Sequence, residues 1–287
     1  MKAVYLRELR AYFTTVIGYL FIASMTLIVG VYAYVLNFVQ RYPTFESTLY
    51  GTSFVYLLVI PILTMRSFSQ EQHMRTSDLL YSLPLRLSSV VLGKYFALLT
   101  VLAIPCLLFC LYPLVLSCFG AVEMGTAMSS IFAFFLLGAA LSAVGMFLSS
   151  LTSNQIASAI IIFIVSFLCY LMQDILAYLP TSAYASFLCF LILILAAAVF
   201  VYLLTKSSLF SAGFAVAGEI ILTALYFWKP SVFENAFPKM MGSLALFARF
   251  DRFTSGLFDV GAVVYYLSVI FLFLFFSVLS LEKRRWS

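Results

Sequence analysis

The sequence predicts an all-α integral membrane protein with about eight transmembrane helices. Hydrophobic residues make up 64% of its 287 residues and charged residues only 9%, and the mean hydropathy is +1.12. Soluble domains carry about 25% charged residues, so this chain lacks the polar surface that water requires. In addition, apolar runs of about twenty residues, the length that crosses a bilayer as a helix, recur along the chain.

Eight runs are expected to cross the membrane within one transmembrane domain of residues 1–287. They cover residues 15–37, 50–66, 88–117, 126–149, 155–175, 184–205, 208–228 and 261–281. The second run is short, and Pro105 and Pro113 are expected to kink the third, because proline removes a helical hydrogen bond and clashes with the preceding turn.

Residues 1–14 are expected to form an interfacial helix along the inner face of the membrane. Apolar residues fall on one side of this helix, at Tyr5, Leu9, Tyr12 and Phe13. Charged residues lie mostly elsewhere around it, at Lys2, Arg7, Glu8 and Arg10. A cleaved signal peptide is the alternative, but the apolar run that follows is too long and no small-residue cleavage pattern follows it.

The basic residues predict the orientation, because lysine and arginine collect on the cytoplasmic side. With the N-terminus inside, only five of the 16 basic residues lie outside. These are Arg41, Lys229, Lys239, Arg249 and Arg252. The opposite orientation inverts that ratio, so both termini are expected to be cytoplasmic.

Residues 61–94 are the long polar interruption in the first half of the chain. Ser67 and Gln70 have capping-box spacing, and Pro84 should end the helix, which predicts a cytoplasmic helix over residues 67–83. Glu71, Arg75 and Asp78 share one face. An apolar stripe runs through Met65, Phe68, Leu79, Leu80 and Leu83. Such a helix can press one side on the bilayer and offer the other to a soluble partner, and a solvated helix without a partner is the alternative.

The longest non-spanning segment, residues 229–260, is expected outside the membrane. Its apolar residues recur on one side, at Leu244, Phe247, Phe250 and Phe253. The segment is too short to bury a core of its own, so an interfacial or re-entrant helix pair is expected.

Two features inside the membrane stand out, and the first, Glu219, has two opposed interpretations. Glu219 near the middle of the seventh run costs about 2.5–3.5 kcal/mol to insert, so it should face protein or water. It marks either a substrate or proton pathway or a protonated glutamate that hydrogen-bonds a neighbouring helix. Small residues of the fourth run should allow close helix approach. They are Gly138, Ala139, Ala140, Ser142, Ala143 and Gly145.

The sequence indicates no catalytic site. It has no GxxxxGK[ST] loop to hold nucleotide phosphates, and His73 is its one histidine, so sites built on paired histidines are excluded. The five cysteines lie in or beside apolar runs without metal-ligand spacing, which predicts buried free thiols and no metal site. Uphill transport would therefore need energy from another subunit or from an ion gradient.

Two motifs resemble type-2 ATP-binding-cassette (ABC) exporter permeases, in particular the gliding-motility-like branch. They are PILTMRSFSQEQHMRTSDLLYSLPLRLSSVVLGK at residues 61–94 and GMFLSSLTSNQ at residues 145–155. The likeness extends over residues 1–175 and roughly 240–285. Family members have six spans, so the expected pair 184–205 and 208–228 is a departure.

The resemblance implies a bacterial cytoplasmic membrane protein that pairs as a homo- or heterodimer and binds two cytosolic ATPase subunits. Those subunits would hold ATP and magnesium, and this chain would hold no cofactor and no nucleic acid. Residues 1–14 would be the elbow helix and residues 67–83 the coupling helix. The residues at the ATPase interface would be Phe68, Glu71, Gln72, Arg75, Asp78 and Leu79.

Three functions remain open from the sequence. The first is an ABC exporter permease that moves an amphipathic, peptide or lipid-like substrate outward and is not itself an enzyme. The second is a secondary transporter or channel driven by an ion gradient, with Glu219 as the proton carrier. The third is a non-transporting membrane anchor of a larger complex. The polar stretch 61–94 favours the first, because a channel has no need of such a helix.

Overall fold

The computed structural model describes residues 1–74, 87–179, 181–205 and 208–286, and over these residues the chain is entirely helical. It forms two compact units, here called unit 1 (Met1–Tyr170 with Leu246–Ser287) and unit 2 (Leu171–Ala245). The single domain expected over residues 1–287 stays a prediction.

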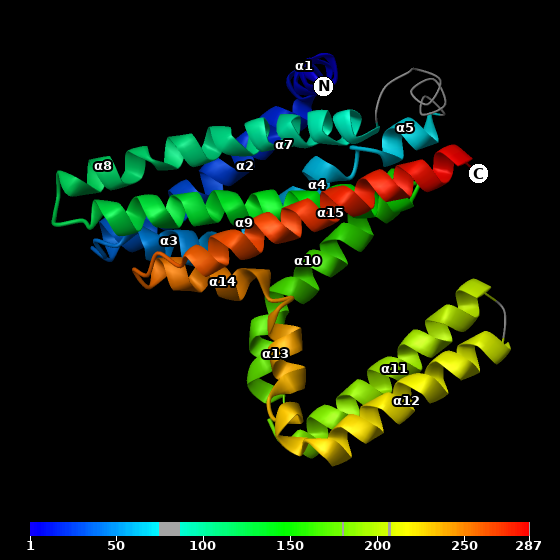
Figure 1. Cartoon of the computed structure of the whole chain (residues 1–287). Helices are drawn as coiled ribbons and strands as arrows, with labels where there is room; N and C mark the ends of the chain where they lie inside the picture. The colour runs from blue at the N-terminus through cyan, green and yellow to red at the C-terminus, as the bar shows by residue number, and fades with distance from the viewer. Residues whose placement is uncertain (75–86, 180, 206–207, 287) are drawn as a thin grey trace. The chain divides into compact units, whose positions relative to one another are not determined.

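Unit 1 is built around one central helix, α9 (Met124–Leu151). Around α9 pack α15 (Val260–Trp286), α7 (Leu87–Phe109), α14 (Leu246–Thr254), α4 (Val55–Thr64) and α3 (Phe45–Thr52) (Figure 1). The apolar window of α9 is 78% buried, whereas that of α7 is 39% buried. This high burial identifies α9 as the core helix of unit 1.

The small residues of α9 explain how its neighbours come so close. A Cβ added to Gly138 would lie 2.8 Å from Cζ of Tyr56, and one added to Gly145 would lie 3.0 Å from Cβ of Thr64. Tyr56 also donates a hydrogen bond of 2.9 Å to the carbonyl of Phe134. The close helix approach predicted from the small residues is thus confirmed for α4 on α9.

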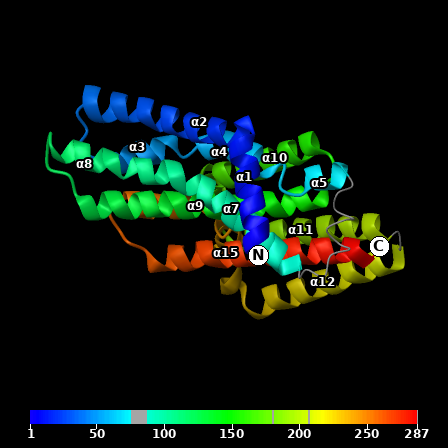
Figure 2. The same ribbon diagram turned by 90° about the horizontal axis from the view of Figure 1, so that it is seen from above.

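The N-terminal helix α1 (Lys2–Thr14) is separated from α2 (Val16–Ala33) by extended backbone at Thr15. It crosses the direction of α7 and α9 (Figure 2) and packs on α7. The distinct helix predicted at residues 1–14 is therefore present. After α2, the chain continues through the π-helix η1 (Tyr34–Val39).

The predicted third span is one apolar stretch, Leu87–Ser117, with a break near Pro113, whereas Pro105 lies inside a continuous helix. The helix α7 ends at Phe109, and α8 (Leu111–Ser117) begins after Cys110. Pro113 explains the break, because it cannot donate to the carbonyl of Phe109 four residues earlier and its ring crowds that carbonyl.

The described residues contain six helices long and apolar enough to cross a membrane, or seven if one bent pair counts as a span. That pair, Phe45–Thr52 with Val55–His73, bends by 59°. The expected number of eight is therefore not reached. The predicted span 184–205 falls on α11 (Ala183–Thr205), whose described apolar part, Ala183–Val199, is shorter than a span.

Unit 2 contains the end of α10 (Gln155–Tyr178), α11, α12 (Ser208–Trp228), the 3-10 helix η2 (Pro230–Phe233) and α13 (Ala236–Gly242). The helices α11 and α12 are antiparallel neighbours (Figure 1). Near one end, Ser211 donates to the carbonyl of Ala198 at 2.6 Å, and near the other the rings of Phe187 and Tyr226 lie 4.7 Å apart.

The predicted outer segment 229–260 forms short helices, η2, α13 and α14, and is divided between the two units. One detail of the prediction is wrong. Phe247, Phe250 and Phe253 are buried as expected, but Leu244 is 52% exposed. Because α14 begins only at Leu246, Leu244 precedes the helix, and Leu246 is buried with the three phenylalanines instead.

Candidate functional site

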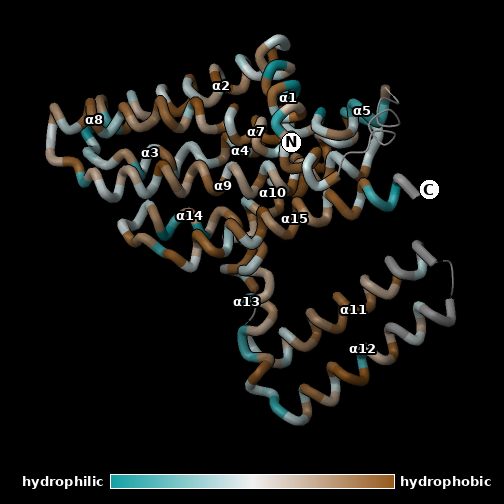
Figure 3. The backbone as a smooth tube through the Cα atoms, turned by 45° about the horizontal axis from the view of Figure 1, so that its top comes forward, coloured by the Kyte–Doolittle hydropathy of each residue, from teal (hydrophilic) through white to brown (hydrophobic). Residues whose placement is uncertain are grey.

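Hydrophilic residues of unit 1 gather on α1, on α5 (Ser69–His73) and at the last turns of α15, which we call the polar end (Figure 3). The described part of the predicted helix 67–83 is α5, and residues 75–83 lie outside the described residues. Two sets of polar contacts hold α5 at this end, one on each side.

On one side lies a buried ammonium group. Lys94 of α7 is 3% exposed, and its Nζ donates to the carbonyl of Ser67 at 2.8 Å. The same Nζ lies 3.1 Å from Oε1 of Glu8 and 3.0 Å from Oε1 of Glu71, and 5.3 Å from the ring centre of Phe68. A buried unpaired ammonium is costly, so these partners permit a lysine at this depth.

Arg7 of α1 closes this group of side chains. Its Nη2 lies 2.6 Å from Oε1 of Glu8 and 2.8 Å from Oε1 of Glu71. We call Arg7, Glu8, Glu71 and Lys94 the charge cluster. It sets two cations against two carboxylates and joins three helices, α1, α5 and α7.

The charge cluster fixes the ionisation of Glu8. Burial by itself would raise the pKa of Glu8, but Lys94 and then Arg7 outweigh it and hold the pKa below its ordinary value of 4.5. Burial would likewise lower the pKa of Arg7, but Glu8 and Glu71 raise it above its ordinary range. Glu8 and Arg7 are therefore charged at neutral pH.

On its other side, α5 is bound to the ends of α9 and α15. Gln72 donates through Nε2 to the carbonyl of Ser150 at 3.1 Å. Arg284 of α15 donates through Nη1 to Oε1 of Gln72 at 2.7 Å and through Nη2 to the carbonyl of Leu151 at 2.8 Å. Gln72 thus lies between α9 and α15, as Glu71 lies between α1 and α7.

The start of α5 is held by a residue from α9, which corrects the predicted capping box. Ser67 makes no cap, and Gln70 instead accepts a hydrogen bond of 2.7 Å from Nε of Arg66. The hydroxyl of Ser149 accepts from the amides of Phe68 at 3.2 Å and Ser69 at 3.3 Å, and donates to the carbonyl of Met65 at 3.0 Å. A tertiary contact therefore replaces the local one.

The structure describes half of the predicted ATPase contacts. Phe68 is 3% exposed and lies under Lys94, while Glu71 and Gln72 make the contacts above. Arg75, Asp78 and Leu79 lie outside the described residues. The role of all six in partner binding stays a prediction. Glu219 lies half-buried on α12 in unit 2, where its carbonyl accepts a hydrogen bond of 2.7 Å from Thr223.

Sequence reasoning missed the residues that organise this site, namely Arg7, Glu8, Lys94, Ser149 and Arg284. One signal was available for Lys94, which lies two turns inside the apolar run 88–117 and so requires a partner. Among the described residues, no group of three or more histidine, cysteine, aspartate or glutamate side chains could hold a metal ion.

Comparison with protein-family models and with curated proteins finds no match to this chain. The described residues contain six or seven long apolar helices, and the charge of Lys94 in one of them is paired. The protein is a multi-pass helical membrane protein. Within it, the polar end offers a short helix, α5, that is joined to four others.

Proposed function

We propose that the chain is the permease subunit of an ATP-driven exporter, with α5 as the element that receives force from a separate cytosolic ATPase. The observation that carries the proposal is the attachment of α5 on both sides. Glu71 binds it to α1 and α7, and Gln72 binds it to α9 and α15. A displacement of α5 would therefore be transmitted directly to α1, α7, α9 and α15.

The contacts leave one part of α5 available to a partner. His73 and Met74 at its end are exposed, Met74 by 61%. The partner would press on this end and on the residues that follow, while the charge cluster and Ser149 keep the start of α5 fixed to the core. Buried charge-assisted contacts suit this role, because they hold one geometry rather than many.

The helix count supports the same proposal. Apart from α11 and α12, the part of the chain that the structure describes has five helices long and apolar enough to cross a membrane and one bent pair. These make the six spans of the permeases that residues 61–94 and 145–155 resemble. The α11–α12 hairpin is then an addition to that plan, and it leaves both termini on one side of the membrane.

Because the sequence has no phosphate-binding loop, ATP-driven transport by this chain would use a second subunit. Two copies of the chain would pair and bind two ATPase subunits, which hold ATP and magnesium. ATP binding and hydrolysis there would switch the paired permeases between conformations and move an amphipathic, peptide or lipid-like substrate outward.

The test is the composition of the complex purified from its native host in mild detergent, weighed by native mass spectrometry. We expect two P-loop ATPase chains per two permease chains. The double variant His73→Ala/Met74→Ala should shed the ATPase yet keep its melting temperature, because both side chains are exposed. Glu123→Ala, an exposed carboxylate outside the charge cluster, is the matched control and should retain the ATPase.

A wild-type protein that runs without any P-loop ATPase would overturn the proposal. An ATPase that binds the double variant as tightly as the wild type would remove α5 from the contact.

A further inference from the structure

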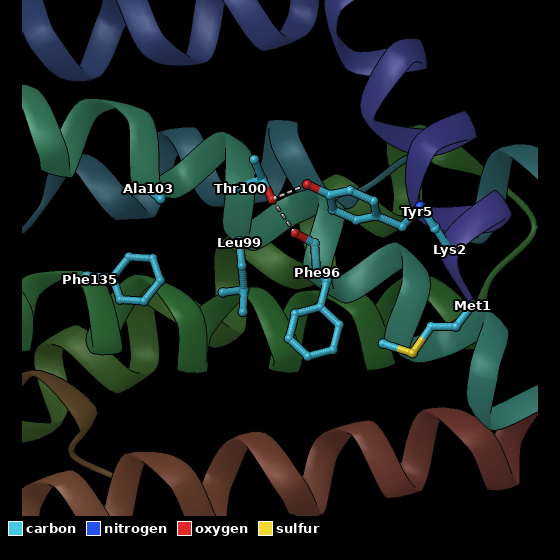
Figure 4. Close-up of a pocket in the computed structure, with 8 residues that line it drawn as sticks. All are labelled: Met1, Lys2, Tyr5, Phe96, Leu99, Thr100, Ala103 and Phe135. Atoms are coloured by element: carbon cyan, nitrogen blue, oxygen red, sulfur yellow. Dashed lines mark hydrogen bonds between the residues drawn. The ribbon is translucent and has the colours of Figure 1, made fainter.

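An apolar groove of about 760 Å³ opens between α1 and α7 (Figure 4). Its walls come from three helices. The lining residues are Met1 just before α1, Lys2 and Tyr5 of α1, Phe96, Leu99, Thr100 and Ala103 of α7, and Phe135 of α9. Ligand pockets in proteins commonly have volumes of about 300–1,000 Å³, so the groove is large enough for a small organic molecule or one lipid chain.

The crossing of α1 over α7 creates the groove. The helices meet closely at Gly93, where an added Cβ would lie 3.1 Å from Cβ of Val4. From this point the helices diverge, because α1 runs across the direction of α7 (Figure 2). The space beside their contact is the groove.

The polar groups on the wall are already satisfied by each other. Thr100 donates to the carbonyl of Phe96 at 2.8 Å, and so the hydroxyl of Tyr5 is the donor in its 3.0 Å contact with Thr100 (Figure 4). Apart from Lys2, the remaining wall is hydrocarbon, with Phe96 43% exposed. A hydrocarbon wall whose hydroxyls are already hydrogen-bonded favours an aliphatic occupant over a polar one.

Charge at the mouth of the groove selects the kind of aliphatic molecule. Lys2 lines the mouth and is exposed, and the first turn of α1 carries no acidic residue. Glu8, the acidic residue of α1, is paired with Lys94 and Arg7 in the charge cluster. A cation beside an apolar groove at the membrane surface fits a phosphate joined to an acyl chain.

We propose that this groove holds one acyl chain of an anionic phospholipid, with the lipid phosphate beside Lys2. The chain lies against Phe96, Leu99 and Ala103 and fills the space between α1 and α7. Because α1 and α7 also carry the charge cluster, the bound lipid stabilises their contact. The proposal does not depend on the transport function.

The test compares phosphatidylglycerol with phosphatidylcholine of the same acyl chains, added to the purified protein and counted by native mass spectrometry. Ala103→Phe fills the groove and should abolish the retained phosphatidylglycerol. The matched control is Leu107→Phe, one turn further along α7, where Leu107 is 69% exposed outside the groove, and it should bind as the wild type does. Lys2→Gln should lower the preference for phosphatidylglycerol about fivefold, as expected for one lysine near an anionic surface.

A second measurement does not require a variant that folds. Phosphatidylglycerol with a photoreactive group in its acyl chain should cross-link within residues 96–103 of the wild-type protein, and inorganic phosphate should not compete. Absence of that cross-link would overturn the proposal. So would an Ala103→Phe variant that binds phosphatidylglycerol normally and changes only the number of chains per complex, because the groove would then be an interface between copies.

Discussion

Lys94 is the residue on which the polar end depends. It is buried to 3% exposure, and its ammonium satisfies the carboxylates of Glu8 and Glu71 and the carbonyl of Ser67 together. Removing one member of a buried ion pair leaves the other charge without compensation, which costs more than the pair itself contributes. Loss of Lys94 is therefore expected to destabilise the polar end by more than its ion pairs contribute.

Lys94→Met should lower the free energy of unfolding by about 2–3 kcal/mol. This is less than for a fully buried pair, because Glu8 and Glu71 keep 16% and 21% exposure. Thermal unfolding in detergent measures this loss of unfolding free energy. Lys239→Met replaces an exposed lysine and should change stability by no more than about 0.5 kcal/mol. Equal effects of both variants would contradict the described role of Lys94.

The charge cluster also predicts how stability depends on pH. The pKa of Glu8 is lowered in the folded protein, so its contribution is complete above the ordinary value of 4.5 and is lost as the pH falls through the folded pKa. In Lys94→Met, burial of Glu8 is opposed only by Arg7, so the folded pKa of Glu8 should rise and its contribution to the decline at acid pH should become smaller. Melting temperatures from pH 7 to pH 4 measure this, and parallel curves for the two proteins would refute it.

At the scale of elements, the close contact of α9 with α4 rests on two glycines. Gly138→Ala and Gly145→Ala should each cost about 1–3 kcal/mol, because the new methyl would overlap Tyr56 or Thr64. Gly125→Ala is the matched control on the same helix, with no atom within 4 Å of an added Cβ. It should be neutral or stabilising by up to about 1 kcal/mol, since alanine favours helix. Equal losses at all three positions would contradict this packing.

The long apolar helices could be predicted because the bilayer fixes their length and composition. The capping of α5 could not, because Ser149 is distant in sequence and competes successfully with the local hydroxyl of Ser67. The apolar face of α14 was mispredicted at Leu244 because periodicity alone does not show where a short helix begins. The pairing of Lys94 with Glu8 could not be predicted either, because it depends on the crossing of α1 over α7 in the folded protein.

At the scale of the whole molecule, the main constraint is whether the chain crosses the membrane an even or an odd number of times. The helices α11 and α12 are antiparallel, so they either both cross the membrane or both do not. If the bent pair Phe45–Thr52 with Val55–His73 is one span, as we propose, the termini lie on the same side in either case. Single cysteines in a cysteine-free background test this with a membrane-impermeant reagent. We expect Lys2→Cys and Glu282→Cys to react only after permeabilisation and Gly120→Cys to react in intact cells. Opposite accessibility of the two termini would contradict the arrangement.

The central claim is that α5 receives a cytosolic ATPase, and a photoreactive residue at His73 tests it most directly. Irradiation of native membranes should give one adduct of the permease with a chain that contains a P-loop, identified by peptide sequencing. The same residue placed at Glu123, beyond the other end of α9, should give no such adduct. No adduct from His73, or the same adduct from both positions, would contradict the account.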